Sequence, residues 1–211
     1  MPTQFDAMSI ALFHESTLAD ADWPAAAAAM AGQAGPSTLW RAIAANHRFN
    51  TLLWHEEDKA RRLDVGADAI AACKRLIDRY NQQRNDAIER IDETLLSQLA
   101  GVTPRPDAWH NSETAGSIVD RLSILALKIH HMRLQTLRED ATPGHVRVCA
   151  DKLARLDLQR NDLIHCFDTL LACAAEGRAF WRIYRQFKMY NDPALNPWLY
   201  RAGSPATDRA R

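Results

Sequence analysis

Apolar residues recur at three- and four-residue steps along most of the chain, which is the spacing of one face of an α-helix. Segments containing glycine, proline or a helix-capping residue divide this pattern into four main parts. The predicted helices run from Leu39 to Arg62, from Asp68 to Leu99, from Ala115 to Arg138, and from the turn at residues 142–144 to about Glu176. We therefore predict an all-α fold.

Two of the predicted helices share one motif, Gln-Arg-Asn-Asp, at residues 83–86 and 159–162. Aligned at this offset of 76 residues (83 to 159), the stretches 73–95 and 149–171 are identical at nine of 23 positions. Each long motif helix follows a shorter helix, so the duplicated units are helical hairpins, at about 39–99 and 115–176. Two such hairpins, related by a near-twofold rotation, most simply close into an antiparallel bundle.

The segment before the first hairpin, residues 1–37, is predicted to be an arm. It contains a short amphipathic piece around Phe5 to Leu18, followed by an alanine run and a stretch with two glycines. Such a composition is typical of a chain terminus that is docked on its domain or partly mobile.

The chain after the second hairpin is predicted to close one end of the bundle. Apolar spacing predicts a further helix from Ala179 to Tyr190, and an extended strap with the aromatic anchor Trp198 follows it. Residues 201–211 have the composition of a disordered tail. A single domain, residues 38–200, is therefore expected to hold both hairpins and the strap.

Arg84 and Arg160, the arginines of the two motifs, fall in the middle of the apolar stripes of their helices. An inward guanidinium keeps its charge and needs a carboxylate, a carbonyl or a bound anion as a partner. Helical winding places further polar residues inward as well. The whole predicted inward set is His47, Asn50, Glu57, Asp58, Arg61, Asn81, Arg84, Arg121, Lys128, Asp157 and Arg160.

Two interpretations of this inward set stay open. In the first, the cations line a pocket that binds a phosphate or carboxylate, and the candidate catalytic residues His47, Glu57 and Asp58 move protons. In the second, the carboxylates neutralise the arginines in a closed ion network that only stabilises the bundle. The set contains five cationic side chains against three carboxylates. This surplus favours an anionic ligand, because buried charge is rarely left unbalanced.

The composition excludes several classes of function. Lys plus Arg and Asp plus Glu number 26 each, so no overall field attracts nucleic acid. No apolar run reaches the length of about 18 residues that a transmembrane helix needs, so no membrane span is expected. The four cysteines have no metal-binding spacing, and the amino terminus lacks a signal-peptide pattern. These two features favour reduced thiols in the cytoplasm.

The motifs of several common enzyme and metal-site classes are also missing. The chain has no glycine-rich phosphate loop and no Gly-x-Ser-x-Gly nucleophile motif. Asp162 and His165 have the spacing of di-metal ligands in a helical bundle, but the pair occurs once and helical winding turns Asp162 away from the apolar stripe. Neither a metal nor a cofactor is therefore expected.

Four stretches of sequence, in their order along the chain, resemble the bacterial all-helical family known as DUF4254, a domain of unknown function. These stretches are Asn50-x-x-Leu53-Trp54-x-x-Glu57-Asp58-x-x-Arg61, Gln83-Arg84-Asn85-Asp86, Asp120-Arg121-Leu-Ser-Ile-Leu-x-Leu-Lys128-Ile129 and Lys188-Met-Tyr-Asn-Asp192-Pro193. The resemblance covers about Leu39 to Tyr200 and implies an all-helical fold and a bacterial origin. It transfers no catalytic residue, because the family has no established activity. Members are often encoded near glycosyltransferases for surface polysaccharide, which implies a sugar-nucleotide or lipopolysaccharide context.

The expected function therefore has two forms, and the sequence does not decide whether the protein is an enzyme. One is a binding protein or enzyme whose Arg- and Lys-lined pocket takes a phosphorylated or carboxylate small molecule in surface-polysaccharide metabolism. The other is a structural or interaction module, either a homo-oligomer or a partner in a glycosyltransferase pathway, whose inner charges form only an ion network.

Overall fold

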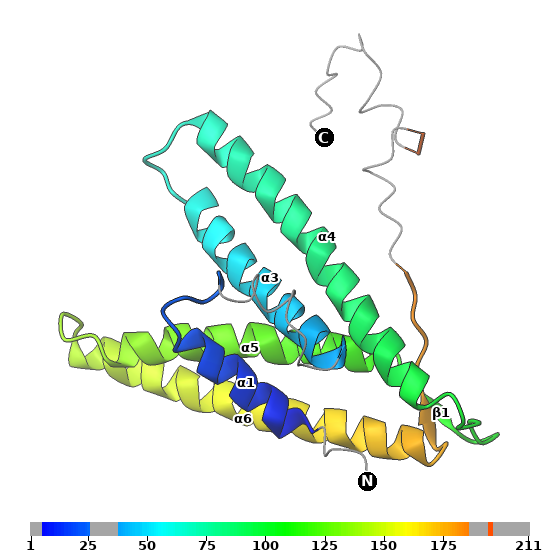
Figure 1. Cartoon of the computed structure of the whole chain (residues 1–211). Helices are drawn as coiled ribbons and strands as arrows, with labels where there is room; N and C mark the ends of the chain where they lie inside the picture. Colours follow the sequence, from blue (N-terminus) through cyan, green and yellow to red (C-terminus); the bar gives the residue numbers. More distant parts are fainter. Residues whose placement is uncertain (1–5, 26–37, 186–193, 196–211) are drawn as a thin grey trace, which may run out of the picture.

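A computed structural model describes residues 6–25, 38–185 and 194–195 of the 211-residue chain. Its elements are the helices α1 (Ala7–Leu18), α3 (Thr38–Ala60), α4 (Ala67–Gln98), α5 (Ala115–Thr136) and α6 (Pro143–Ala175), and the short strands β1 (Trp109–His110) and β2 (Ala179–Phe180) (Figure 1). The predicted all-α class is confirmed. The four hairpin helices also begin and end within a few residues of their predicted bounds. None of the described helices is both long and apolar enough to cross a lipid bilayer.

The helices α5 and α6 begin where the sequence offers a capping side chain. The hydroxyl of Thr114 accepts the N–H of Ser117 at 3.1 Å, and the hydroxyl of Thr142 accepts the N–H of His145 at 3.3 Å. Each hydroxyl replaces the helical partner that a first-turn amide lacks. Pro143 follows Thr142 in the first turn of α6, where its missing N–H costs nothing.

The two hairpins, α3–α4 and α5–α6, cross each other, and their turns lie far apart (Figure 1). The central helix is α5, as its nearly continuous apolar sequence predicts, because it contacts α1, α3, α4 and α6. It contributes Ile118, Val119 and Leu122 to the single core cluster between the hairpins. The predicted helical bundle is therefore confirmed, in a crossed arrangement.

The sequence repeat gives α4 and α6 the same role, which is to hold the start of another helix. Asp92 of α4 accepts the N–H of Gly116 near the start of α5 at 2.8 Å. Its repeat counterpart, Asp168 of α6, accepts the N–H of Ala7 at the start of α1 at 2.9 Å. A carboxylate at this position satisfies an amide without a helical partner and faces the positive end of the helix dipole. Against α6, α1 thus takes the place that α5 takes against α4.

The amphipathic piece of the predicted arm is part of the core. Ala7 and Ile10 of α1 have no exposed surface and belong to the same apolar cluster as the hairpins. The helix begins at a capping residue, because Asp6 accepts the N–H of Ser9 at 2.7 Å. This part of the arm is therefore docked on the domain, which is one of the two behaviours that its composition predicts.

The predicted helix from Ala179 to Tyr190 is wrong where the structure describes it. Gly177 has a φ of 70°, a left-handed conformation that ends α6. The chain then continues as β2, which pairs in parallel with β1. Two of the apolar residues behind the helix prediction, Ala179 and Trp181, are buried here without a helix, at 2 % and 3 % exposed. The rest of that segment, the strap and the tail lie outside the described residues, except for residues 194–195.

Candidate functional site

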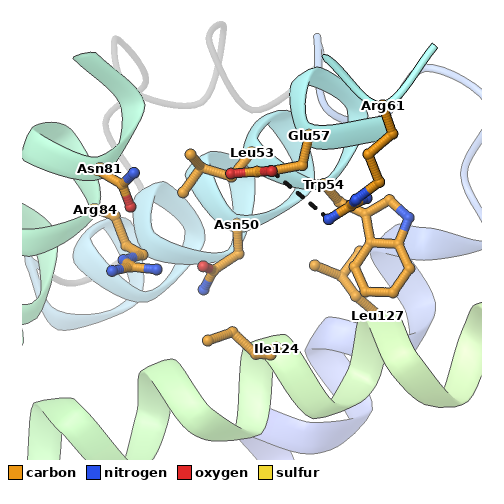
Figure 2. A pocket seen from close by; sticks show the side chains of 9 residues that line it. All are labelled: Asn50, Leu53, Trp54, Glu57, Arg61, Asn81, Arg84, Ile124 and Leu127. Carbon is orange, nitrogen blue, oxygen red and sulfur yellow. Dashed lines mark ion pairs between the residues drawn. The ribbon is translucent and has the colours of Figure 1, made fainter. Parts of the chain in front are cut away.

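A cavity of about 250 Å³ lies between α3, α4 and α5 (Figure 2). Its lining residues are Asn50, Leu53, Trp54, Glu57, Arg61, Asn81, Arg84, Ile124 and Leu127. The polar members from α3 and α4, which are Asn50, Glu57, Arg61, Asn81 and Arg84, all belong to the predicted inward set. Five of the side chains that helical winding predicts to face inward therefore do lie together, on two helices.

Arg84 is the cation that faces this cavity from α4. Its side chain is 27 % exposed, and its Nε atom makes no hydrogen bond with a described residue. Asp120 Oδ1 lies 3.9 Å from Nε, which is beyond hydrogen-bond length. Figure 2 shows Asn50 and Asn81 close to the guanidinium. A guanidinium in this setting keeps donors for an acceptor that enters the cavity.

Asp120 of α5 is a weak partner for Arg84 because its carboxylate is already engaged. Its Oδ1 atom accepts hydrogen bonds from the side-chain amides of Asn46 at 2.8 Å and Asn50 at 2.9 Å. The Asn50 amide also lies 2.9 Å from the hydroxyl of Ser123. This network fixes Asn50 at the cavity wall. The predicted inward set misses Asp120, although a single acidic residue in an otherwise apolar and basic helix is a visible signal.

Arg160, the repeat counterpart of Arg84, has a different environment. Its guanidinium forms an ion pair with Glu15 of α1 and a second one with Asp157 at 3.3 Å. Its side chain is 23 % exposed, which is close to the value for Arg84. Two similarly shielded arginines at matching repeat positions therefore differ in charge compensation. Arg160 has two carboxylates in close contact, whereas the described ion pair of Arg84 is the long one with Asp120, at 3.9 Å.

The residue three positions before each arginine explains part of this difference. Asp157 precedes Arg160 and lies on the same helical face. The corresponding residue before Arg84 is Asn81, which lines the cavity and carries no charge. The repeat copy with the cavity thus lacks the local carboxylate that neutralises the other copy.

Glu57, Asp58 and Arg61 lie together in the last turns of α3. Arg61 forms ion pairs with Glu57 at 3.6 Å and with Asp58 at 2.7 Å. Figure 2 marks the first pair at the edge of the cavity. These side chains are between 46 % and 66 % exposed, and the described ion pairs of Glu57 and Asp58 are with Arg61 and not with either motif arginine. The reason is that the end of α3 extends beyond the region where the hairpins cross.

His47 is inward, as predicted, but it lies in the core and not at the cavity. Its Nδ1 atom is 2.8 Å from the hydroxyl oxygen of Ser123. Its ring stacks with those of His14 and Trp23, with ring centroids 4.4 Å and 5.2 Å apart. Burial lowers the pKa of His47 to about 3. This candidate catalytic residue is therefore a neutral imidazole in the core of the protein.

Arg121 and Lys128 are exposed and not inward as predicted. Arg121 bonds to Glu113 at 2.8 Å, and Lys128 lines a second cavity further along α5. The apolar residues of α5 cover most of its circumference and pack against four other helices. Its few cationic residues therefore mark the remaining solvent side. Carboxylates already neutralise Arg61 and Arg160. The predicted surplus of positive charge at the cavity is consequently the charge of Arg84.

Trp54 forms a wall of the cavity that the predicted binding set does not contain. It follows Leu53 on α3, and its ring stacks on that of His131 with centroids 4.5 Å apart and planes at 3°. Ile124 and Leu127 of α5 complete the apolar side (Figure 2). The site thus has a polar half around Arg84 and an apolar half around Trp54.

No group of three or more His, Cys, Asp or Glu side chains in residues 6–25, 38–185 and 194–195 is arranged to hold a metal ion. The cysteines of the chain, Cys73, Cys149, Cys166 and Cys173, are free thiols.

Comparison with known proteins gives a family but no activity. No curated protein and no solved structure matches the chain. One family model does match, and it spans residues 40–183, which includes α3, α4, α5 and α6 and the whole cavity. Because this match covers more than half of the chain, the protein belongs to the family described as "Protein of unknown function (DUF4254)".

Proposed function

We propose that this protein binds an anionic small molecule in the cavity between α3, α4 and α5, with a phosphate or carboxylate group at Arg84. The observation that carries the proposal is the contrast between the two motif arginines. Arg160 has two carboxylates in direct contact, whereas among the described residues the nearest carboxylate oxygen to the Arg84 Nε atom is 3.9 Å away. A shielded guanidinium without a direct counter-ion favours an external anion.

The surroundings of Arg84 support this assignment. Asn50 and Asn81 can contribute polar contacts to the same ligand. Asn81 is uncharged, whereas its repeat counterpart Asp157 has a carboxylate, and a carboxylate at this position would repel an anion. Trp54 and Leu127 offer apolar surface for the rest of the molecule. The volume of about 250 Å³ suits a molecule of a few carbons with one anionic group, because drug-sized ligands occupy pockets of roughly 300–1,000 Å³.

The test is isothermal titration calorimetry with inorganic phosphate, sugar phosphates and dicarboxylates on the wild-type protein and on Arg84→Met. Loss of a charge-assisted contact typically costs about 1.5–3 kcal/mol, so the variant should bind at least about tenfold more weakly. Arg160→Met is the matched control, because it removes the same charge from the repeat copy where carboxylates already occupy the guanidinium.

The two variants should separate binding from stability. Arg160→Met leaves Glu15 and Asp157 without their partner, so it should lower the unfolding free energy by about 1–2 kcal/mol while anion affinity stays unchanged. Equal affinity of the wild-type protein and Arg84→Met would refute the proposal. A screen without any anion binding, together with a melting temperature that rises with protein concentration, would instead indicate assembly.

A further inference from the structure

A second cavity lies next to the anion site. It has a volume of about 280 Å³ and opens between α3, α5 and α6. Its lining residues are Trp54, Lys128, His131, Met132, Gln135 and Leu156, and the surface that they present is almost entirely apolar. Trp54 also lines the first cavity, so the polar chamber at Arg84 and this apolar chamber meet at one indole.

The two chambers follow one another along a single helix. Ile124 and Leu127 of α5 line the first chamber, and Lys128, His131 and Gln135 line the second. Counted from Ile124, these positions follow the steps i, i+3, i+4, i+7 and i+11, which is the spacing of one side of a helix. The distance from position 124 to position 135 along the helix axis is about 16 Å, at about 1.5 Å per residue. A chain of several carbon atoms attached to a group at Arg84 can therefore extend from one chamber into the other.

The cationic side chains at the two chambers indicate where the anionic group of such a ligand would lie. Arg84 faces the polar chamber, and Lys128 lies beside the apolar one without an ion pair to any described carboxylate within 4.0 Å. Beyond Lys128, the walls are Met132, His131 and Leu156, which offer apolar contact and no acidic group. His131 stacks on Trp54, and burial lowers its pKa, which favours the neutral ring.

We infer that the ligand is an anionic amphiphile, in which a phosphate or carboxylate head is joined to an apolar chain. The head lies at Arg84, and the chain passes Trp54 and fills the apolar chamber beside Met132 and Leu156. This inference rests on the proposed anion site and adds the chemical class of the ligand. A compact, fully polar anion would use the first chamber and leave the second without a function.

The experiment measures the affinity of a series of alkyl phosphates, from inorganic phosphate through ethyl and butyl to octyl phosphate, below their micelle concentrations. Burial of each methylene contributes about 0.8 kcal/mol, so the affinity should rise about fourfold per methylene until the chain fills the second chamber. Inorganic phosphate at the start of the series reports on the Arg84 site alone.

Two variants test where the chain lies. Met132→Ser and Leu156→Ser each remove apolar wall from the second chamber, and either should flatten the rise with chain length while leaving the affinity for inorganic phosphate unchanged. Leu134→Ser is the control on the same helix, because Leu134 is 48 % exposed and lines neither chamber. Two target variants are used so that failure of one to fold leaves the other.

The outcomes separate this inference from the anion site itself. Phosphate binding that depends on Arg84 but does not change with chain length would overturn the amphiphile and retain the anion site. A rise with chain length that persists in both chamber variants would place the chain elsewhere and also overturn the inference. Equal binding of octyl phosphate by the wild-type protein and Arg84→Met would show that the head does not lie at Arg84, which would contradict both assignments.

Discussion

His47 and Ser123 are hydrogen-bonded at 2.8 Å and are separated by 76 residues, which is the offset of the sequence repeat. Each is therefore the repeat counterpart of the other. Residues that contact their own counterparts lie at a pseudo-twofold axis, so this bond places the axis between α3 and α5. The two helices have almost the same length, 23 and 22 residues, as two copies of one element should.

The helix α1 breaks this symmetry on one side of the axis. Its His14 stacks on His47, and its Glu15 supplies a carboxylate to Arg160. In the other half, Arg84 lies near Asp120 of α5, whose own repeat position in α3 is Ala44. The half without α1 contains the cavity. One duplicated sequence thus yields a closed ion cluster in one copy and an open site in the other.

Acid should destabilise the protein through the stacked pair His14 and His47. Burial lowers the pKa of His47 from 6.5 to about 3 and that of His14 well below 6.5, and both imidazoles are fully buried. Between these values the unfolded chain binds protons that the folded chain does not. The unfolding free energy should therefore fall as the pH drops below about 6.5, by up to about 1.4 kcal/mol per pH unit for each histidine.

Urea unfolding of the wild-type protein and His14→Phe between pH 7 and pH 4 measures this effect. The phenyl ring keeps the stack and cannot take up a proton, so the pH dependence should become shallower by the contribution of one histidine. Substitution of the exposed His165 by Gln is the control and should leave the slope unchanged. Parallel curves for the wild-type protein and His14→Phe would show that the buried pair does not cause the acid sensitivity.

Exchanging the residues before the two motif arginines should exchange their environments. Asn81→Asp places a carboxylate three residues before Arg84, as Asp157 stands before Arg160. We expect a stability gain of about 0.2–0.5 kcal/mol from the new pair. The affinity of the cavity for inorganic phosphate should fall at least about tenfold, because the new charge both occupies Arg84 and repels the anion.

The reverse substitution, Asp157→Asn, is the matched control for this exchange. It weakens the Arg160 cluster and should lower stability slightly without any effect on phosphate binding. Calorimetric titration and urea unfolding of both variants give the two readouts. If Asn81→Asp binds phosphate as tightly as the wild-type protein, the anion does not lie at Arg84.

The parts of this structure that follow from local sequence were predictable. Apolar spacing and capping residues such as Thr114 and Thr142 act within one or two helical turns, and they define the four hairpin helices correctly. The segment after Gly177 was not predictable in this way. Its structure depends on pairing with β1, 70 residues earlier in the chain (Ala179 with Trp109), and no local period records such a contact.

The candidate site was predictable in part, for a related physical reason. Helical winding shows that Asn50, Asn81 and Arg84 face inward, and these residues do meet at the cavity. Winding does not distinguish a core position from a cavity wall, so His47 is placed inward for the right reason but in the wrong environment. It also cannot reveal that α1 supplies the partner of Arg160, because that contact joins residues 145 positions apart.

Substitution of Gly116 by alanine should be the most damaging change of a single small residue at the start of α5. A Cβ atom at Gly116 would lie 2.6 Å from the carbonyl oxygen of Ile88 and 2.7 Å from Asp92 Oδ2. The first neighbour is backbone of α4 and cannot rotate away, so α5 must move and weaken the bond from Gly116 to Asp92. We expect a loss of about 1–3 kcal/mol in unfolding free energy, the usual cost of overpacking a buried contact.

Gly144→Ala is the control in the first turn of α6, where a Cβ atom would meet nothing within 4 Å, and there alanine should stabilise the protein by about 0.4–1 kcal/mol. Urea unfolding of the two variants measures both effects, and equal stabilities would show that α4 and α5 are not held together as closely as the bond between Asp92 and Gly116 requires.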